Sequence, residues 1–495
     1  MQFITAYFAI FMTFSFIGYY IVPCKYRYLF LLSCNILYYL SWLANLASLF
    51  SLISVILITW IGAKLVENTA DEKYRKIFLT VTVILTLGSL LYFKYADFFL
   101  ENITAILRAT GLELNTRSIN PLMPIGISFY TFQSLSYVFE IYRKKLNTEK
   151  NLLLYAAYVT FFPTILSGPI ESPHNLLSQI KKIDQIGIRF ENIQKGIILI
   201  LSGAWIKYVI VDRFSTIVNA VFDSYHSFGT VILCFGSICY TFQIYCDFLA
   251  YSLIALGLGK LLGIVLTENF NAPYFSISIQ DFWRRWHISL STWLKNYVYI
   301  PLGGSRCSAL RKNINLFITF LISGIWHGAN WTFIIWGIIH GIYQIVGNVT
   351  NPLREWLYCR LQVKRDCFSF RLGQHICTFA FVSFAWIFFR ADSISAAFEY
   401  ILRMVSKLDI WNLFNNSIYN LGLDVLQMNI LFVSFGIFIL FDWYKFKTNT
   451  NIDDFLSNQN LAFSWLVIIL LFINTLVFGM YGPGINASDF IYFQF

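Results

Sequence analysis

The side chains best suited to acid–base chemistry in this sequence are its six histidines, and His327 is the strongest candidate among them. His327 lies in the stretch SGIWHGANW, inside a long apolar run, with Trp326 before it and Gly328 after it. Imidazole titrates near neutral pH and can accept or donate a proton. Ionisable side chains within a membrane are costly, so each one found there is a functional candidate. The alternative is a hydrogen-bonded structural histidine between two helices.

The other five histidines have more ordinary alternatives. His287, in the stretch RRWHISLS, is the second candidate, and its alternative is an interfacial histidine beside two arginines. His340 follows His327 on the next apolar run and is interpreted as structural. Three further histidines are interpreted as loop or interface residues, namely His174, His226 and His375.

Two buried acidic residues, and the absence of several known motifs, limit the kinds of reaction that the sequence supports. Glu140 and Asp247 lie in apolar stretches, where each would pair with a basic or hydroxyl neighbour or line a wet cavity. No metal is expected, because no residues occur at metal-binding spacing. The sequence has neither a phosphate-binding loop nor a dinucleotide fingerprint, which leaves ATP-driven transport unsupported. It also lacks a GxSxG motif, so acyl chemistry through that kind of serine is not expected.

The composition indicates a chain that faces lipid. Of its 495 residues, 57% are hydrophobic and only 13% charged, which is about half the charged content of soluble domains. The net charge of +10 does not indicate nucleic acid as a partner, because Lys and Arg gather in short loops between apolar runs. The sequence therefore predicts an all-α, polytopic integral membrane protein with roughly 11–13 transmembrane helices, organised as a single domain over 1–495.

Thirteen stretches approach the length and apolarity of a membrane span, which needs about 20 residues. They are 2–22, 28–44, 46–65, 77–96, 121–142, 152–170, 196–211, 228–250, 313–330, 331–348, 374–391, 428–443 and 462–481. The stretch 152–170 contains FFPTILSGP and is predicted to be kinked or re-entrant. Irregular backbone at membrane depth survives only where protein or a water-filled cavity surrounds it, so this stretch indicates a cavity.

The basic loops predict the orientation of the chain. These loops all lie on one side of the membrane if the N-terminus is outside and 152–170 enters and leaves the membrane on the same side. Because basic loops are retained in the cytoplasm, that side is expected to be the cytoplasmic one. The C-terminus then lies outside, together with the loops 97–120 and 392–427.

One segment, 266–312, is too polar to cross lipid and yet is rich in aromatic residues. Within it, 278–293 is predicted to form one amphipathic helix on the cytoplasmic side, capped by Ser278. Its apolar face would carry Phe282, Trp286, Leu290 and Trp293, and Arg284, Arg285 and His287 would turn elsewhere.

The last segment, 482–495, ends in FIYFQF, an apolar tail whose one phenol is Tyr492. From composition alone the tail is interpreted as an interfacial anchor on the outer side of the membrane.

Several blocks of the sequence together resemble one family. NFNAPYFSISIQDFWRRWHISLSTWLKNYVYIPLGGSR resembles the signature loop of the bacterial membrane-bound O-acyltransferases. PIGISFYTFQSLSYVFEIYR, FPTILSGPI and SGIWHGANWTFIIWGIIHG resemble further blocks of the same family. The tail resembles the ending of the alginate O-acetyltransferase membrane subunit, and the nearest branch is that of the alginate and peptidoglycan O-acetyltransferase membrane subunits. One departure is DFLAYSLIALG, in which Leu253 replaces an acid usual in this branch.

The resemblance implies a central tunnel that an acyl thioester enters from the cytoplasm and an acceptor hydroxyl enters from outside. His327 matches the catalytic histidine of the family, and His287 matches a second characteristic histidine at the cytoplasmic mouth. The residues expected to line the tunnel or substrate path are Trp326, Asn330, Asp247 and Trp286. Trp326 and Asn330 are hypothesised to orient His327 or to hold the oxyanion.

The resemblance also gives the tail a possible role. Phe490, Tyr492 and Phe495 match the FxYxxF pattern of a small partner peptide in the teichoic-acid D-alanylation system, where the tyrosine hydroxyl is implicated as the acyl carrier. Tyr492 would then act as an acyl carrier within the same chain.

The implied activity is transfer of an acetyl group from a cytoplasmic thioester, acetyl-CoA in the first instance, across a bacterial inner membrane. An extracytoplasmic acetyltransferase partner would then modify a cell-surface or exported polysaccharide. The alternatives are D-alanylation of teichoic acid, a transporter that does no chemistry, and a scaffold for a polymer-export complex.

Overall fold

The structure, a computed structural model, describes Phe3, residues 5–43, 45–111, 118–119 and 121–481, and Phe490. Helices joined by turns and loops make up these ranges, and no strand occurs within them. The prediction of an all-α fold is therefore confirmed. By its internal contacts the chain divides into two compact units. Unit 1 is Met1–Ile197 with Ile254–Thr267, and unit 2 is Ile198–Leu253 with Glu268–Phe495.

Unit 1 holds the first helices of the chain. They are α1 (Ala6–Ile21), α2 (Arg27–Leu40), α3 (Leu46–Asn68), α4 (Glu72–Ala109), α5 (Ile127–Tyr142), α6 (Leu152–Val159) and α7 (Ser178–Ile180), with the single turns η1 (Cys24–Tyr26), η2 (Pro173–Leu177) and η3 (Ile183–Gln185). Two further helices, α8 (Phe190–Trp205) and α10 (Thr230–Leu261), contribute residues to both units.

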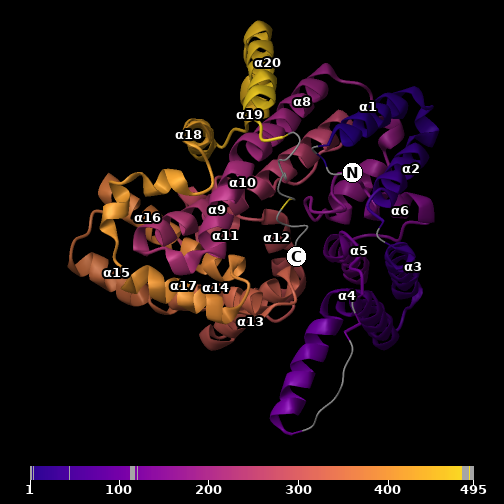
Figure 1. Ribbon diagram of the computed structural model, residues 1–495. Coiled ribbons are helices and arrows are strands. Elements are labelled where there is room, and N and C mark those ends of the chain that lie inside the picture. Colours follow the sequence, from indigo (N-terminus) through magenta and orange to yellow (C-terminus); the bar gives the residue numbers. More distant parts are fainter. Residues whose placement is uncertain are drawn as a thin grey trace. The chain divides into compact units, whose positions relative to one another are not determined.

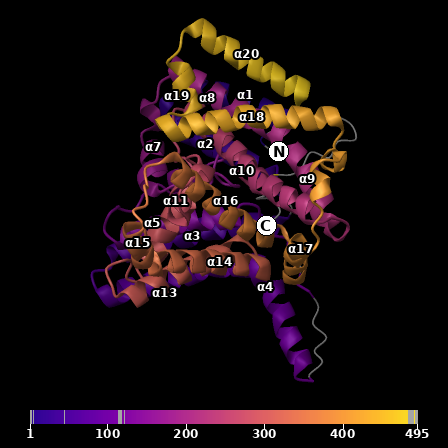
Figure 2. The ribbon, with the colours of Figure 1, turned by 90° about the vertical axis from the view of Figure 1, so that its left-hand side faces the viewer.

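Helices α3, α4 and α5 pack against one another in unit 1 (Figure 1). The last turns of α4 continue beyond α3 and α5 in both views (Figures 1 and 2). With 38 residues, α4 is about 57 Å long at 1.5 Å per residue, roughly twice the hydrocarbon thickness of a bilayer. The expected loop 97–120 is therefore wrong as far as Ala109, because those residues extend the helix.

The stretch 152–170 is broken, as expected. Helix α6 ends at Val159, and the chain continues through buried turns as far as Ser167. Asn35 of α2 satisfies part of this irregular backbone, because its side chain accepts from the Phe162 amide at 3.0 Å and donates to the Ala157 carbonyl at 3.2 Å. Such bonds are what an irregular segment at membrane depth requires.

Unit 2 holds the remaining elements. They are the π-helical turns η4 (Ile206–Val211) and η7 (Lys295–Tyr299), the single turns η5 (Tyr225–Ser227), η6 (Pro273–Phe275), η8 (Ile410–Leu413) and η9 (Asn416–Asn420), and the helices α9 (Asp212–Asp223), α11 (Ile279–Arg285), α12 (Ile288–Leu294), α13 (Ala309–His327), α14 (Trp331–Val349), α15 (Asn351–Arg360), α16 (Phe368–Arg390), α17 (Ile394–Ser406), α18 (Val425–Thr448), α19 (Ile452–Ser457) and α20 (Leu461–Phe478). The expected loop 392–427 is thus partly helical.

The amphipathic segment 278–293 is two helices rather than one. Ser278 caps α11 as predicted, because its hydroxyl accepts from the Asp281 amide at 3.1 Å. The chain then breaks at His287, whose φ of 42° does not fit a right-handed helix, and α12 begins at the next residue. The four predicted apolar positions are all buried. His287 is also fully buried, so its predicted position away from the apolar face is wrong.

Seven of the described helices are long and apolar enough to cross a membrane, namely α3, α4, α10, α14, α16, α18 and α20. The chain is therefore an integral membrane protein. The other expected spans form shorter, interrupted or more polar elements. Helix α1 has 16 residues and α2 has 14. Helix α13 carries two cations, Arg311 and Lys312, in its first turn. The expected total of 11–13 spans remains a prediction.

Helices α13 and α14 lie side by side in unit 2, and glycines set their separation (Figure 2). A Cβ atom on Gly337 would lie 2.5 Å from the Phe320 carbonyl oxygen and 3.1 Å from the Gly324 Cα. A Cβ atom on Gly324 would in turn collide with the Phe333 carbonyl and lie 3.2 Å from the Gly337 Cα. Because these neighbours are backbone atoms, only glycine lets the two helices approach this closely.

Substitution of these glycines tests the close approach. Gly337→Ala should force the helices apart and destabilise the protein by about 1–3 kcal/mol, as overpacking does. Gly347→Ala, on the same helix, is the matched control, because no atom lies within 4 Å of its added Cβ. The control should be neutral or up to about 1 kcal/mol more stable, since alanine favours a helix. Thermal unfolding in detergent measures both variants, and equal midpoints would contradict the account.

Candidate active site

His327 is the last residue of α13, and it is buried among aromatic rings of unit 2. Its ring centroid lies 5.0 Å from that of Trp336 on α14 and 5.2 Å from that of Phe389 on α16. The chain turns at Gly328, where a Cβ atom would collide with the Phe333 ring. The glycine therefore permits the tight packing of the turn that ends α13 against α14.

The ring of Trp326 packs near the rings of both His327 and His287. Its ring centroid lies 5.1 Å from that of His327 and 6.1 Å from that of His287. The break between α11 and α12 therefore places the second predicted histidine close to the first. The structure thus brings together three of the residues that the sequence singled out, from α13 and from the polar segment 266–312.

The surroundings of His287 favour its neutral form. The side chain is fully buried, and its ring centroid lies 4.7 Å from that of Phe248 on α10. Burial lowers the pKa of His287 to about 3, because an imidazolium loses its hydration there. At neutral pH this residue is a neutral imidazole, which can donate or accept a hydrogen bond. A residue with positive φ that is not glycine is also strained, and such strain is concentrated at functional sites.

His340 belongs to the same aromatic group but has a structural partner. The indole Nε1 of Trp283 on α11 donates to its Nδ1 at 3.2 Å, which assigns the ring proton to Nε2. The Trp336 ring contacts both His340 and His327, with centroid distances of 4.9 and 5.0 Å. The bond to Trp283 agrees with the structural interpretation of His340.

Asp247 on α10 is fully buried and pairs with Lys207, which the sequence analysis missed. The Lys207 ammonium lies 2.9 Å from the Asp247 carboxylate and 3.4 Å from that of Asp212. Lys207 occupies the π-helical turn η4, and such turns are frequent at functional sites. The stretch SGAWIKYVIVDR could have revealed it, because a lysine within an apolar run is as unusual as a histidine.

The described part of the tail lies against this charged pair. Phe490 is 1% exposed, and the Lys207 ammonium lies 4.7 Å from its ring centroid, within the range of a cation–π interaction. The Phe490 ring also meets the Tyr251 ring edge-on at 5.2 Å. Tyr492 and Phe495 lie outside the described residues, so the carrier role of Tyr492 stays a prediction.

Two further residues predicted to line the tunnel, Trp286 and Asn330, have defined contacts in unit 2. Trp286 is buried, with its ring 5.1 Å from those of Phe270 and Trp386. Asn330 caps the start of α14, where its side chain accepts from the Thr332 amide at 3.0 Å and donates to the Asp392 carbonyl at 3.3 Å. The amide nitrogen of Asn330 has two N–H donors, so the bond to Asp392 does not by itself exclude a role at an oxyanion. Within the described residues no group of three or more potential metal ligands is found.

The arrangement can support proton transfer in an environment poor in water. Two histidine rings lie next to the ring of one tryptophan, and Phe248, the neighbour of Asp247 in the sequence, packs on His287. Imidazole in such a setting can take the proton of a hydroxyl that attacks a carbonyl.

Comparison with known proteins points to one kind of chemistry. Residues 36–389 match the family model described as MBOAT, membrane-bound O-acyltransferase family, and this range includes His287 and His327. The chain is 33% identical to a probable alginate O-acetylase, AlgI, of Azotobacter vinelandii over 96% of both chains. It is 32% identical to a peptidoglycan O-acetyltransferase of Helicobacter pylori over 80% of this chain and 78% of the relative. A teichoic acid D-alanyltransferase of Bacillus subtilis is 30% identical over 47% of this chain and 62% of the relative. The resemblance of the sequence blocks is thereby confirmed.

The buried ion pair makes a testable contribution to stability. Lys207→Met should cost about 3–5 kcal/mol, because it leaves carboxylates buried without their cation. Asp247→Asn should cost clearly less, since Lys207 keeps Asp212 at 3.4 Å. Thermal unfolding in detergent compares the two variants. A larger loss for Asp247→Asn than for Lys207→Met would show that Lys207 is not the group that holds the cluster together.

Proposed function

Because this chain belongs to the membrane-bound O-acyltransferase family, it is an O-acyltransferase, and we propose that it moves an acetyl group from a cytoplasmic thioester to the outside of the membrane. The acetyl group is destined for a cell-surface or exported polysaccharide of the alginate or peptidoglycan type. The observation that carries the proposal is the burial of His327 beside Trp326 and His287, within the range that matches the family.

In the proposed reaction His327 acts as the general base. A hydroxyl oxygen attacks the carbonyl carbon of the thioester while the imidazole takes the hydroxyl proton. The carbon–sulfur bond then breaks, and the leaving thiolate takes the proton from the imidazolium, which returns His327 to its neutral form. His327 ends α13, and the carbonyl end of a helix favours a positive charge, so the imidazolium formed in this step is stabilised. His287, whose ring also lies next to that of Trp326, has a supporting role in this step.

The tail could provide the first hydroxyl. Tyr492 follows Phe490 by two residues in the sequence. Phe490 is buried against Lys207 and Tyr251, which supports a tail held inside unit 2 rather than one anchored only at the lipid surface. In this scheme the Tyr492 phenol accepts the acetyl group as an ester, and the acceptor hydroxyl then attacks that ester.

The remaining elements of the proposal follow the family. The donor is acetyl-CoA, the acceptor side is served by an extracytoplasmic acetyltransferase partner, and the protein lies in a bacterial inner membrane with both termini outside. Residues 1–495 act as one domain, which is supported by a family match that includes parts of both units. Trp326, Asp247 and Trp286 would line the tunnel between the donor and acceptor sides.

D-alanylation of teichoic acid is the second candidate activity. It is supported by the similarity to the teichoic acid D-alanyltransferase of Bacillus subtilis, which covers 47% of this chain. The O-acetyltransferase proposal is preferred because the similarity to the alginate O-acetylase covers 96%.

Acetylation in cells tests the roles of His327 and Tyr492. His327→Gln should lower polysaccharide acetylation by about 100-fold or more, the usual contribution of a general base. Tyr492→Phe should have a comparable effect if the phenol carries the acetyl group. Acetate released from the polysaccharide by mild base measures the activity, and immunoblotting of membranes measures the amount of protein. His226→Gln and Tyr481→Phe are matched controls, because both side chains are largely or partly exposed.

The outcomes separate the hypotheses. Loss with His327→Gln alone would leave the tail as an anchor and require the acceptor to be acylated directly. Persistence of acetylation in both variants at normal protein levels would contradict the proposed chemistry and favour a transporter or scaffold.

A further inference from the structure

A cavity in unit 2 lies outside the aromatic group that holds the histidines of the candidate site. It has a volume of about 600 Å³, and the lining includes neither His287, His327 nor His340. Its walls come from the chain around the start of α11, from residues 365–375 and from the end of α18. We call it the basic pocket, and the residues that matter here are Asp281, Arg285, Arg365, Arg371, Phe446 and Lys447.

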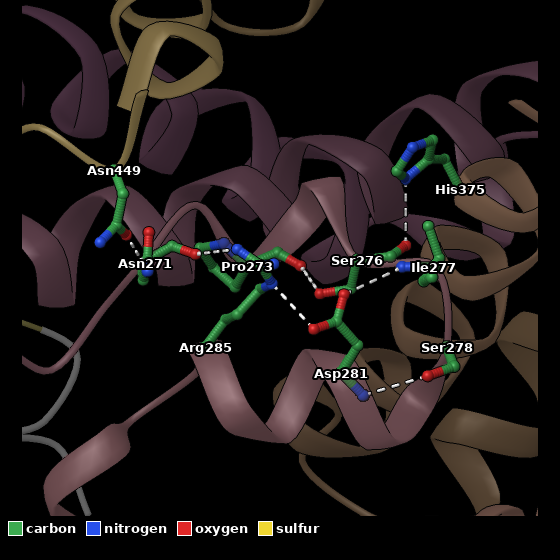
Figure 3. A network of polar contacts seen from close by, with 9 residues as sticks. All are labelled: Asn271, Pro273, Ser276, Ile277, Ser278, Asp281, Arg285, His375 and Asn449. Carbon is green, nitrogen blue, oxygen red and sulfur yellow. Dashed lines mark hydrogen bonds and ion pairs between the residues drawn. The ribbon is translucent and has the colours of Figure 1, made fainter. Parts of the chain in front are cut away.

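Arg285 is held in a fixed position in one wall of the pocket. Its Nε donates to Asp281 at 3.0 Å, its Nη1 donates to the Asn271 carbonyl at 3.3 Å, and its guanidinium lies 5.2 Å from the Phe446 ring centroid. Figure 3 shows Arg285 reaching toward Asp281, which lies on the same helix. The ring of His375 points at the Ser276 carbonyl of the same wall, at 3.2 Å (Figure 3). This wall needs little rearrangement to receive a ligand.

The positive charges of the pocket exceed its negative ones. Four cations line it, Arg285, Arg365, Arg371 and Lys447, against the carboxylates of Asp281 and Asp366. Glu355 holds Arg365 at 2.7 Å from outside the lining. Each of the three arginines is thus paired with one carboxylate, and Lys447 makes no ion pair with any described residue. A guanidinium has five N–H donors, so one carboxylate does not exhaust it.

One of these pairs is readily exchanged for a ligand. Arg371 lies 3.0 Å from Asp366, but their side chains are 59% and 98% exposed. A pair so exposed contributes little free energy. A phosphate could replace the Asp366 carboxylate and accept two parallel hydrogen bonds from the guanidinium.

The surroundings of the pocket resemble a membrane surface. The adjoining α16 is one of the apolar helices long enough to span a membrane, and it begins at Phe368, which is 79% exposed. The preceding α15 exposes Trp356 and Leu353 beside Arg354 and Arg360. Aromatic side chains and cations at the end of a span are typical of the headgroup layer.

We infer that the basic pocket is a binding site for a phosphate ester. Two sources share this chemistry: the headgroup of an anionic phospholipid, and the nucleotide of a soluble thioester donor. Arg285 and Arg371 would contact the phosphate, Lys447 would supply the charge that no carboxylate compensates, and Phe446 would pack on the apolar or aromatic part of the ligand. The nucleotide source rests on the proposed acyltransferase function, whereas the lipid source does not.

Charge removal at the exchangeable positions tests the inference. The double variant Arg371→Ala/Lys447→Ala should keep its thermal midpoint, because neither residue makes a buried polar contact among the described residues. Its binding of phosphate esters should weaken by about tenfold or more. Arg360→Ala is the matched control, since Arg360 is exposed in the same basic region and does not line the pocket.

Two measurements on the full-length protein distinguish the sources. Native mass spectrometry of protein released from nanodiscs of phosphatidylglycerol and phosphatidylcholine counts retained anionic lipid. Equilibrium dialysis against adenosine 3′,5′-bisphosphate measures binding of a soluble phosphate ester. A selective loss of lipid in the double variant identifies the headgroup source, and a selective loss of bisphosphate identifies the nucleotide source. Equal binding by wild type, double variant and Arg360→Ala in both measurements would overturn the inference, as would equal losses in the double variant and Arg360→Ala.

Discussion

The close approach of α13 and α14 at Gly324 and Gly337 is the constraint on which the candidate site depends. The two backbones come so near that a single Cβ atom would separate them. Their contact holds the end of α13, where His327 lies, against Trp336 of α14. The neighbouring Trp326 ring in turn packs near His287, at the break between α11 and α12. A catalytic histidine must be positioned to within a fraction of an ångström, and rigid helices do this better than loops.

A second constraint is the cost of ionisable groups in an apolar interior. The protein lowers this cost in two ways. His287 is kept neutral by burial, and Lys207 is neutralised by Asp247 and Asp212. Phe490 from the tail lies on the same lysine, so the charge cluster also serves as a contact for the end of the chain. The site thus lies beside a buried lysine that has two carboxylate partners, and its own imidazole at His287 is neutral, so neither His287 nor Lys207 is buried as an isolated charge.

The sequence predicted the parts of this arrangement that depend on apolar runs and short motifs. Apolar length predicted the membrane helices. The position of His327 within an apolar run singled it out as a candidate, and its catalytic role stays a prediction. The packing of Phe282, Trp286, Leu290 and Trp293 was predicted from helical spacing, but the break at His287 was not, because a positive φ in a residue other than glycine has no local signal. The partner of Asp247 was also missed, since Lys207 lies 40 residues away in the chain and only the fold brings them together.

The central claim is that His327 removes a proton as an acyl thioester is attacked, and release of the free thiol tests it most directly. Membranes that contain the full-length protein and its acetyltransferase partner would be mixed with acetyl-CoA and a polysaccharide acceptor, and the released thiol would be followed with a chromogenic disulfide. We predict that the wild type releases thiol in the presence of acceptor. The His327→Gln variant, with an unchanged thermal midpoint, should release it at a rate reduced by about 100-fold or more. Thiol release by His327→Gln at the wild-type rate would contradict the account.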